Sequence, residues 1–275
     1  MTKFNNNTDW YIEMADYIIN SFWDIWKYKI RHIKSISALF LAWAPWAWKT
    51  EFLDTIFKDL KENFIVIDID IYRNLFDWYN WENSDEFQKW SVKVADKILS
   101  FCFKNNLNFV FDGTFRNFNK IKENFWQCEK YNRKSLITLI FQEPRVSFYY
   151  TFLRKIKKKR NVPITIFIDW FYSSIENVFK AISIFDNVDL IIAHKIYSFL
   201  DKDKWVFKID YKTNNINNFC EKYRILYKKW EFKNRENLKL DIIKYNNILL
   251  QEKLEKGNLY LKTKIWAIEK FFKSF

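Results

Sequence analysis

The chain has 275 residues, 49% of them hydrophobic, and a formal net charge of +13. This composition excludes intrinsic disorder, and the absence of an uncharged apolar run of about 18 residues or more excludes a recognisable membrane span. The N-terminus lacks the apolar core of a signal peptide, so we expect a cytoplasmic protein of one large or two small domains. The excess of basic residues favours anionic partners.

In chain order, short apolar runs alternate with helical periodicity. We expect strands at 37–42, 64–70, 108–111, 135–141 and 188–193, helices at 50–61, 84–104, 145–159 and 165–185, and a polar loop at 77–83. This alternation is typical of an α/β protein with a mainly parallel sheet and helices on both faces. We divide the chain into an N-terminal helical lead-in (1–36), an α/β core (37–213) and a helical, Lys- and Asn-rich C-terminal extension (214–275).

The cysteines and histidines argue against a metal centre or a disulfide framework. Cys102, Cys128 and Cys220 are odd in number and far apart, so we expect free, buried thiols. His32 and His194 are the only histidines.

The glycine content is anomalous. The chain has 2 Gly and 14 Trp, whereas average usage predicts roughly 19 glycines. Directly after the first strand stands W-A-P-W-A-W-K-T, which with glycine for Trp becomes G-A-P-G-A-G-K-T. That sequence matches the phosphate-loop pattern G-x-x-x-x-G-K-[ST] in its required place between a strand and a helix. The predicted nucleotide-binding residues are therefore Trp43, Ala44, Pro45, Trp46, Ala47, Trp48, Lys49 and Thr50.

We predict that Trp stands for glycine in this loop, as it would if a stop codon read as glycine had been translated as Trp. A phosphate loop wraps phosphates with backbone N–H groups, and a non-glycine residue held left-handed costs about 1–2 kcal/mol. Trp78 and Trp81 support this interpretation, because D-G-Y-N-G-E-N is a natural turn sequence. The alternative is an authentic Trp-rich hydrophobic patch, and individual tryptophans elsewhere could be genuine.

The residues around this loop suit phosphoryl transfer. Lys49 is a point charge for the β- and γ-phosphates, and Thr50 offers a hydroxyl to Mg²⁺. Asp68 and Asp70 close the second predicted strand, at the edge where parallel sheets place their ligands. A carboxylate there can orient an acceptor hydroxyl and take its proton. Alternatively, either aspartate only caps the following helix.

With glycine restored, the chain resembles the zeta-toxin family of P-loop kinases, which phosphorylate UDP-N-acetylglucosamine, from about residue 39 to residue 195. Besides the phosphate loop, the resemblance rests on I-D-I-D-I-Y-R (67–73), N-S-D-E-F-Q-K (83–89), F-D-G-T-F-R (111–116), F-Q-E-P (141–144), K-R-N-V-P (159–163) and I-E-N-V (175–178). It implies a P-loop NTPase fold with a nucleoside-kinase-like parallel sheet, ATP and Mg²⁺, and a nucleotide-sugar substrate. An antitoxin partner is conceivable on the same ground.

The resemblance also implies roles for individual residues. Asp70 matches the catalytic base, and the substrate-binding positions fall on Asp96, Asp112, Thr114 and Arg116. Asp112 stands where the family usually has Glu, which shortens its reach by one methylene. Otherwise, Asp112 belongs to a plain D-G turn and Asp96 to a solvated helix face.

Two arginines of the family clamp the triphosphate, and they match Arg160 and, with a gap, Arg154; Lys155 is an alternative to Arg154. Planar guanidinium groups fit phosphate oxygens better than lysine does. The basic run 154–160 could instead be a solvated face or a nucleic-acid patch.

These features together predict an ATP-dependent kinase that transfers the γ-phosphate to a hydroxyl of UDP-N-acetylglucosamine. One alternative is a P-loop kinase of another small-molecule acceptor. The other is a non-catalytic, basic nucleic-acid-binding protein, whose affinity would fall steeply with salt. We expect no membrane partner.

Overall fold

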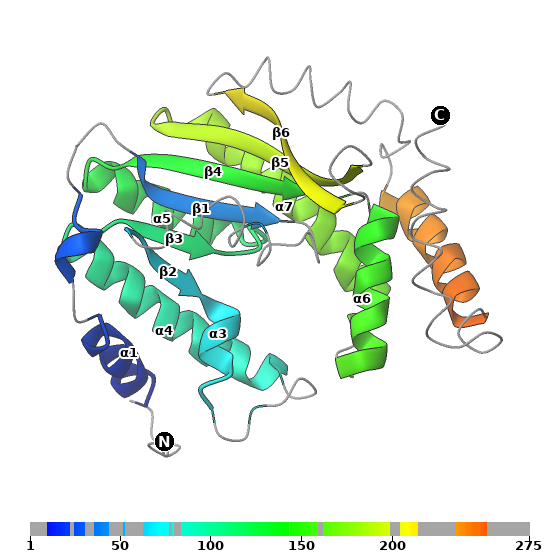
Figure 1. Ribbon diagram of the computed structural model, residues 1–275, viewed down its shortest axis with the longest axis horizontal. Helices are drawn as coiled ribbons and strands as arrows, with labels where there is room; N and C mark the ends of the chain where they lie inside the picture. The colour runs from blue at the N-terminus through cyan, green and yellow to red at the C-terminus, as the bar shows by residue number, and fades with distance from the viewer. Residues whose placement is uncertain are drawn as a thin grey trace.

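The computed structural model describes residues 10–22, 25–30, 36–43, 52, 63–76, 79, 84–142, 144–158, 162–198, 204–213 and 235–251. A six-stranded sheet forms the centre of this part of the chain (Figure 1). Its strands are β1 (Ile36–Trp43), β2 (Ile65–Asp68), β3 (Phe109–Asp112), β4 (Lys134–Phe141), β5 (Val188–Ser198) and β6 (Lys204–Thr213).

The strand order is β2-β3-β1-β4-β5-β6. The first five strands are parallel, and β6 joins β5 as an antiparallel edge strand. This arrangement confirms the expected mainly parallel sheet. Its parallel pairs need crossover connections, which the helices between the strands supply.

The labelled helices are α1 (Trp10–Asn20), the short 3-10 helix η1 (Ile25–Tyr28), α3 (Ile69–Arg73), α4 (Ser84–Lys104), α5 (Phe118–Lys130), α6 (Pro144–Lys158) and α7 (Ile164–Ile184). A further helix at residues 235–251, here called the C-terminal helix, is drawn in orange in Figure 1. Helix 84–104 has the predicted bounds. Five other predicted elements differ from the structure by one residue at one or both ends: the strands at 37–42, 108–111 and 135–141 and the helices at 145–159 and 165–185.

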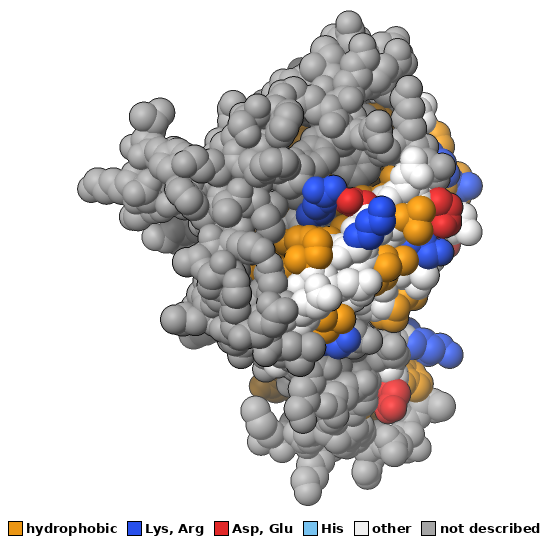
Figure 2. All heavy atoms as spheres, turned by 90° about the vertical axis from the view of Figure 1, so that its right-hand side faces the viewer, with side chains coloured by type: hydrophobic (Ala, Val, Ile, Leu, Met, Phe, Trp, Pro, Cys, Tyr) orange, Lys and Arg blue, Asp and Glu red, His pale blue; other side chains and the backbone are white. Residues whose placement is uncertain are grey.

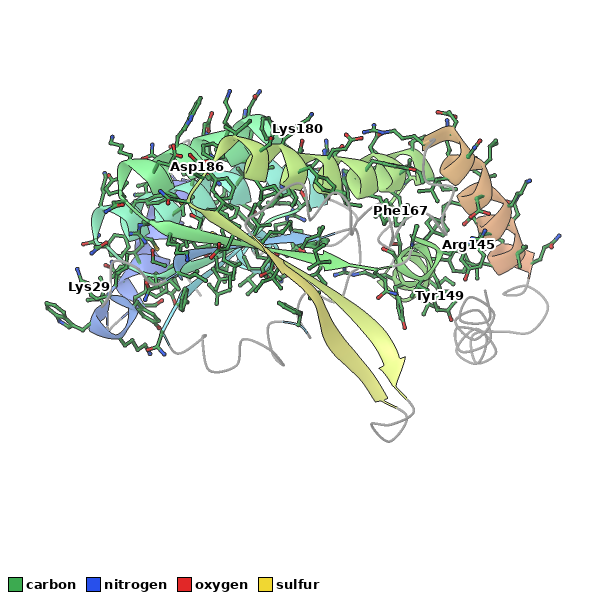
Figure 3. All side chains as sticks on the ribbon, turned by 90° about the horizontal axis from the view of Figure 1, so that it is seen from above. Lys29, Arg145, Tyr149, Phe167, Lys180 and Asp186 are labelled. Carbon is green, nitrogen blue, oxygen red and sulfur yellow. The ribbon has the colours of Figure 1, made fainter. Side chains whose placement is uncertain are left out.

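The sheet separates two hydrophobic cores because side chains alternate along its strands. On β1, Ala38, Phe40 and Ala42 face one core, which also contains residues of α1, α4, α5 and the second half of α7. Leu39 and Leu41 face the other core, which contains residues of α6, the first half of α7 and the C-terminal helix. Helices therefore contribute to both cores, as expected for a sheet with helices on both faces, and Figure 3 labels Tyr149 of α6 and Phe167 of α7, which belong to the second core.

Several elements differ from the prediction. The strand expected at 64–70 ends at Asp68, because α3 begins at the next residue. Neither α5 nor β6 was expected, and β5 runs on to Ser198 beyond the predicted end at 193. In both missed elements charged residues interrupt the apolar positions, which obscures their periodicity. The predicted helix 50–61 lies outside the described residues except for Phe52. The same holds for the predicted loop 77–83 except for Tyr79.

Left-handed backbone is supplied by residues other than glycine. Among the described residues, positive φ angles occur at Asn106 (57°), Phe115 (53°) and Asn132 (50°). The two asparagines follow α4 and α5, where a left-handed residue commonly ends a helix and where Asn is the usual substitute for glycine. Phe115 belongs to no helix end, and it lies in the loop after β3.

Two further expectations concern the thiols and the membrane. Cys102 and Cys128 are free and buried, as predicted, and burial raises the pKa of each thiol to about 12. Cys220 lies outside the described residues. Within the described ranges, none of the helices combines the length and the apolar character needed to cross a membrane.

Candidate active site

The carboxyl ends of three neighbouring strands align in one row. Leu41 of β1 is in register with Asp112 of β3, and Asp112 is in register with Asp68 of β2. Because adjacent strands are about 4.8 Å apart, the backbones that carry the Asp68 and Asp112 carboxylates are close neighbours at this edge. Strand β1 ends at the same edge with Trp43, the first residue of the predicted phosphate loop. Open parallel sheets bind ligands there.

Asp68 ends β2 and caps α3. Its Oδ1 accepts a hydrogen bond of 2.8 Å from the backbone N–H of Asp70. The capping alternative that the sequence left open therefore holds for Asp68.

Asp70 lies in the first turn of α3 rather than at the end of a strand, and its side chain is 26% exposed. Arg73, one turn later, places Nη1 at 3.1 Å from Oδ1 of Asp70. The guanidinium is buried and also donates through Nη2 to Oε1 of Gln88 on α4. Arg73 thereby holds a partly exposed carboxylate next to Asp68, the last residue of β2.

Asp112 is buried, with 3% of its surface exposed, and the Trp43 indole N–H donates to its Oδ1 at 2.9 Å. The Trp43 side chain is thus hydrogen-bonded to one oxygen of the carboxylate that we expect to contact the substrate. Glycine at position 43 would leave that oxygen without the indole.

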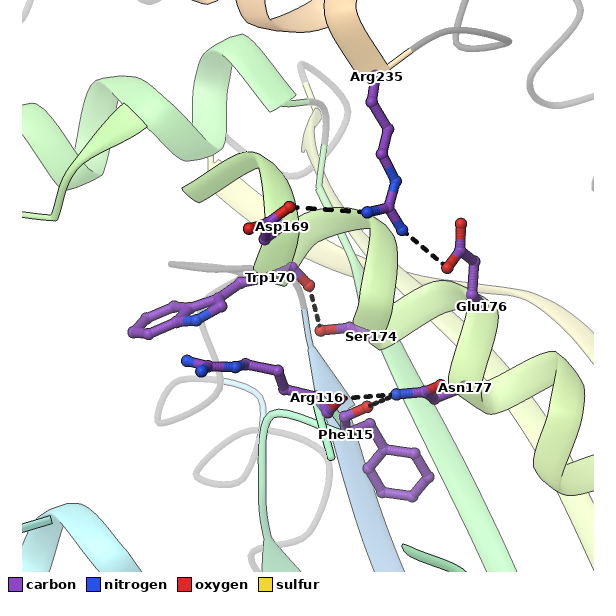
Figure 4. A network of polar contacts seen from close by, with 8 residues as sticks. All are labelled: Phe115, Arg116, Asp169, Trp170, Ser174, Glu176, Asn177 and Arg235. Carbon is purple, nitrogen blue, oxygen red and sulfur yellow. Dashed lines mark hydrogen bonds and ion pairs between the residues drawn. The ribbon is translucent and has the colours of Figure 1, made fainter. Parts of the chain in front are cut away.

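The loop that follows Asp112 is bound by α7 (Figure 4). The Ser174 hydroxyl lies 2.6 Å from the Thr114 carbonyl oxygen, and the Asn177 amide donates to the carbonyls of Phe115 and Arg116 at 2.8 and 2.9 Å. The exposed Arg116 guanidinium lies over the Trp170 ring, 5.5 Å from its centroid. Thr114 and Arg116 are therefore carried by a segment held in one conformation.

Asp96 is on α4, and its Oδ1 forms a 2.9 Å ion pair with the Lys120 ammonium in the first turn of α5. Burial raises the pKa of the Asp96 carboxyl, and the hydrogen bond and charge of Lys120 oppose that rise. The carboxylate therefore links α4 to the helix that follows the Thr114–Arg116 loop. The alternative of a fully solvated helix face does not describe this half-buried group.

The remaining predicted residues are only partly placed. Arg154 is half-buried on α6, and Lys155 beside it is exposed.

Figure 2 views the molecule from the right-hand side of Figure 1, where basic, acidic and apolar side chains of the described residues are interspersed. Ala44, Pro45, Trp46, Ala47, Trp48, Lys49, Thr50 and Arg160 lie outside the described residues.

Sequence reasoning missed four residues that support this site: Arg73, Gln88, Ser174 and Asn177. Three of them belong to segments already singled out, at 67–73, 83–89 and 175–178. Their partners are distant in the sequence or on another element, so spacing alone gave no signal for these contacts.

The topology and the site at the carboxyl edge define a P-loop NTPase fold with a nucleoside-kinase-like parallel sheet and a helical C-terminal region. The sequence profile of the zeta-toxin family matches residues 27–204, and the chain belongs to this family of P-loop kinase-like toxins. No curated protein sequence matches the chain.

Solved structures share the fold at low sequence identity. A structure from the PezAT chromosomal toxin–antitoxin system of Streptococcus pneumoniae is 18% identical with a TM-score of 0.57, and the match covers 90% of this chain and 98% of that one. A complex of AvrRxo1-ORF1 and AvrRxo1-ORF2 with ATP is 10% identical with a TM-score of 0.52, covering 76% and 71% of the two chains.

Proposed function

We propose that the protein is an ATP- and Mg²⁺-dependent kinase that phosphorylates a hydroxyl group of UDP-N-acetylglucosamine. The observation that carries the proposal is the alignment of Asp68 and Asp112 at the edge where the segment 43–50 leaves β1, with Asp70 fixed beside them by Arg73. A kinase needs an acceptor carboxylate next to its phosphate-binding loop, and the position of these aspartates at the carboxyl end of β1 supports that assignment.

The ATP side of the site is assigned to residues 43–50, with glycine at 43, 46 and 48. Backbone N–H groups of this loop would surround the phosphates, and Lys49 would bind the β- and γ-phosphates. The related AvrRxo1 complex was solved with ATP, which supports this assignment.

Magnesium fits the donors available here. Among the described residues, no cluster of three or more Asp, Glu, His or Cys side chains could enclose a metal ion. Mg²⁺ in kinases needs only one or two protein oxygen donors, because phosphates and water complete its coordination. The Thr50 hydroxyl would bind the ion, which when bound supplies positive charge to the phosphate oxygens.

Asp70 is proposed as the base. Its carboxylate accepts the proton of the acceptor hydroxyl, whose oxygen attacks the γ-phosphorus while the bond to the β-phosphate oxygen breaks and ADP leaves. Arg154 and Arg160 would neutralise the charge of the transferring group. Asp96, Asp112, Thr114 and Arg116 would bind the nucleotide sugar.

A protein partner is also proposed. One structural relative comes from a toxin–antitoxin system. Phosphorylation of a cell-wall precursor would harm its host, so we propose that an antitoxin binds this chain and blocks the site. We further propose that the kinase works in the cytoplasm, where both nucleotide substrates occur.

The test is an acceptor panel assayed with the full chain carrying Trp43→Gly, Trp46→Gly and Trp48→Gly. We expect ATP consumption that depends on UDP-N-acetylglucosamine and is abolished by Asp70→Ala. Consumption that depends on a different small molecule would reassign the acceptor but keep the kinase. ATP turnover that no acceptor changes, or salt-sensitive nucleic-acid binding without ATP binding, would contradict the proposal.

A further inference from the structure

One face of α7 is directed at the loop between β3 and α5. Ser174 and Asn177 lie three positions apart, so both side chains emerge on the same side of the helix. Ser174 is fully buried and Asn177 is 6% exposed. Figure 4 shows both side chains between α7 and the loop residues Phe115 and Arg116.

Three consecutive carbonyl groups of the loop, those of Thr114, Phe115 and Arg116, meet these two side chains. The Asn177 amide has two N–H bonds and donates one to each of two carbonyls. The Ser174 hydroxyl has a single proton, and it lies 2.6 Å from the Thr114 carbonyl and 2.6 Å from the carbonyl of residue 170 within its own helix. None of these contacts depends on a tryptophan side chain.

The loop is held in a conformation that it would not adopt alone. Phe115 has a φ of 53°, which is rare for a bulky residue other than glycine. Its side chain is buried, with 5% of its surface exposed, and packs near Phe40 and Phe125. Backbone strain of this kind persists only where the surroundings fix it, and it gathers at functional sites.

We propose that Asn177 and Ser174 are positioning residues of the kinase, which hold the strained loop so that Thr114 and Arg116 face the acceptor. This inference rests on the proposed function. It assigns α7 a role in acceptor binding that is separate from ATP binding, since the loop follows β3 and the phosphate-loop segment follows β1. Loss of the contacts would free the loop and weaken acceptor binding first.

The test compares Asn177→Asp and Ser174→Ala in the full chain with glycine at 43, 46 and 48. Asp has the shape of Asn but cannot donate when ionised, so it faces two carbonyls without a hydrogen bond. The matched control is Ser183→Ala on the same helix, which removes an exposed hydroxyl bonded to the Lys180 carbonyl and leaves the loop untouched.

For Asn177→Asp, we expect about tenfold faster amide hydrogen exchange in the loop 113–117 and an acceptor KM raised about tenfold, from the loss of two hydrogen bonds. The KM for ATP should stay within about twofold of the parent. Ser174→Ala should change both quantities in the same direction by a smaller factor, and it serves alone if circular dichroism shows that Asn177→Asp does not fold.

Unchanged exchange in the loop would overturn the inference. So would faster exchange with an unchanged acceptor KM, or an equal rise in both KM values, because the loop contacts would then have no specific effect on the acceptor. A parent chain that transfers phosphate to no acceptor would overturn the proposed function and, with it, the acceptor role of α7. The two failures are distinguishable. If only the proposed function fails, hydrogen exchange in the loop still depends on Asn177; if the loop contacts fail, it does not.

Discussion

Asp70 is positioned by a neighbour rather than by its own backbone alone. The buried Arg73 guanidinium pairs with Asp70 and bonds to Gln88, so it joins α3 to α4 at the site. A guanidinium can make both contacts at once because its N–H donors form a planar fork. Lysine could not replace it with the same geometry.

We predict that Arg73→Ala lowers kcat by about 10- to 100-fold, since small displacements of a reacting group cost that much. Binding of ATP should be little affected, because Arg73 belongs to the acceptor side of the site. Steady-state kinetics on the glycine-bearing chain checks this, with Gln88→Ala as the milder companion. An Arg73→Ala enzyme with unchanged kcat would show that Asp70 needs no such support.

Asp96 should influence the pH dependence of stability. Burial raises the pKa of its carboxyl, so the folded state binds the proton more tightly than the unfolded state does. The free energy of unfolding therefore falls as pH rises from the ordinary carboxyl value through the raised one. Asp96→Asn has no proton to lose, and its stability should fall less as the pH rises above the ordinary carboxyl pKa of about 3.9. Urea unfolding at several pH values checks this; equal slopes for parent and variant would contradict it.

Helix ends illustrate how this chain folds with few glycines. After α5, the N–H groups of Asn132 and Arg133 donate to the carbonyls of Glu129 and Cys128, which closes the helix through a left-handed residue. Asn tolerates this conformation because its short polar side chain can bond locally. The written sequence thus retains Asn at helix ends while glycine is missing from the phosphate-loop pattern.

We predict that Asn132→Ala lowers the free energy of unfolding by about 1 kcal/mol, whereas Asn132→Gly leaves it equal or higher. Asn132 is exposed, so no packing is lost in either case. Asn187→Ala is the matched control, since Asn187 is an exposed turn residue without a positive φ. Denaturant unfolding measures all three; an Ala variant as stable as the parent would be contrary to this explanation of the helix end.

The sequence predicted the regular elements better than their junctions. Helix 84–104 was readable because apolar residues recur at helical spacing, and α5 was not, because its buried positions Ile121, Phe125 and Cys128 stand among charged residues. The predicted strand ran through Asp70, because the alternating I-D-I-D pattern at 67–70 is typical of a strand. In the structure, Asp68 instead caps a helix that begins at the next residue. The contacts of Ser174 and Asn177 depend on tertiary placement, which no local pattern encodes.

At the scale of the whole molecule, the C-terminal helix is attached to the kinase-like fold. Arg145 of α6 and Asp241 form a bidentate ion pair with both N–O distances at 2.6 Å, and Arg235 pairs with Glu176 of α7 at 2.9 Å. The second core, which contains Leu39 and Leu41 of β1, also buries three residues of this helix: Leu238, Ile242 and Leu249. The division of the chain at 36/37 and 213/214 stays a proposal, within which this helix is an extension packed on α6 and α7.

Ile242 offers a test of that packing. It is fully buried, so Ile242→Ala should lower the free energy of unfolding by about 2–4 kcal/mol. Ile248→Ala on the same helix is the control, because Ile248 is 48% exposed and its loss should cost within about 0.5 kcal/mol. Equal, small effects of the two substitutions in denaturant unfolding would mean that the helix is not part of the core.

The proposed kinase requires that residues 43–50 close around a triphosphate. ATP binding, measured by calorimetry with Mg²⁺ on the chain as written and on the chain with Trp43→Gly, Trp46→Gly and Trp48→Gly, tests this most directly. We predict that only the glycine-bearing chain binds ATP and that Lys49→Ala weakens its binding at least about tenfold, as loss of a charged contact should. No binding by the glycine-bearing chain, or binding indifferent to Lys49, would contradict the account.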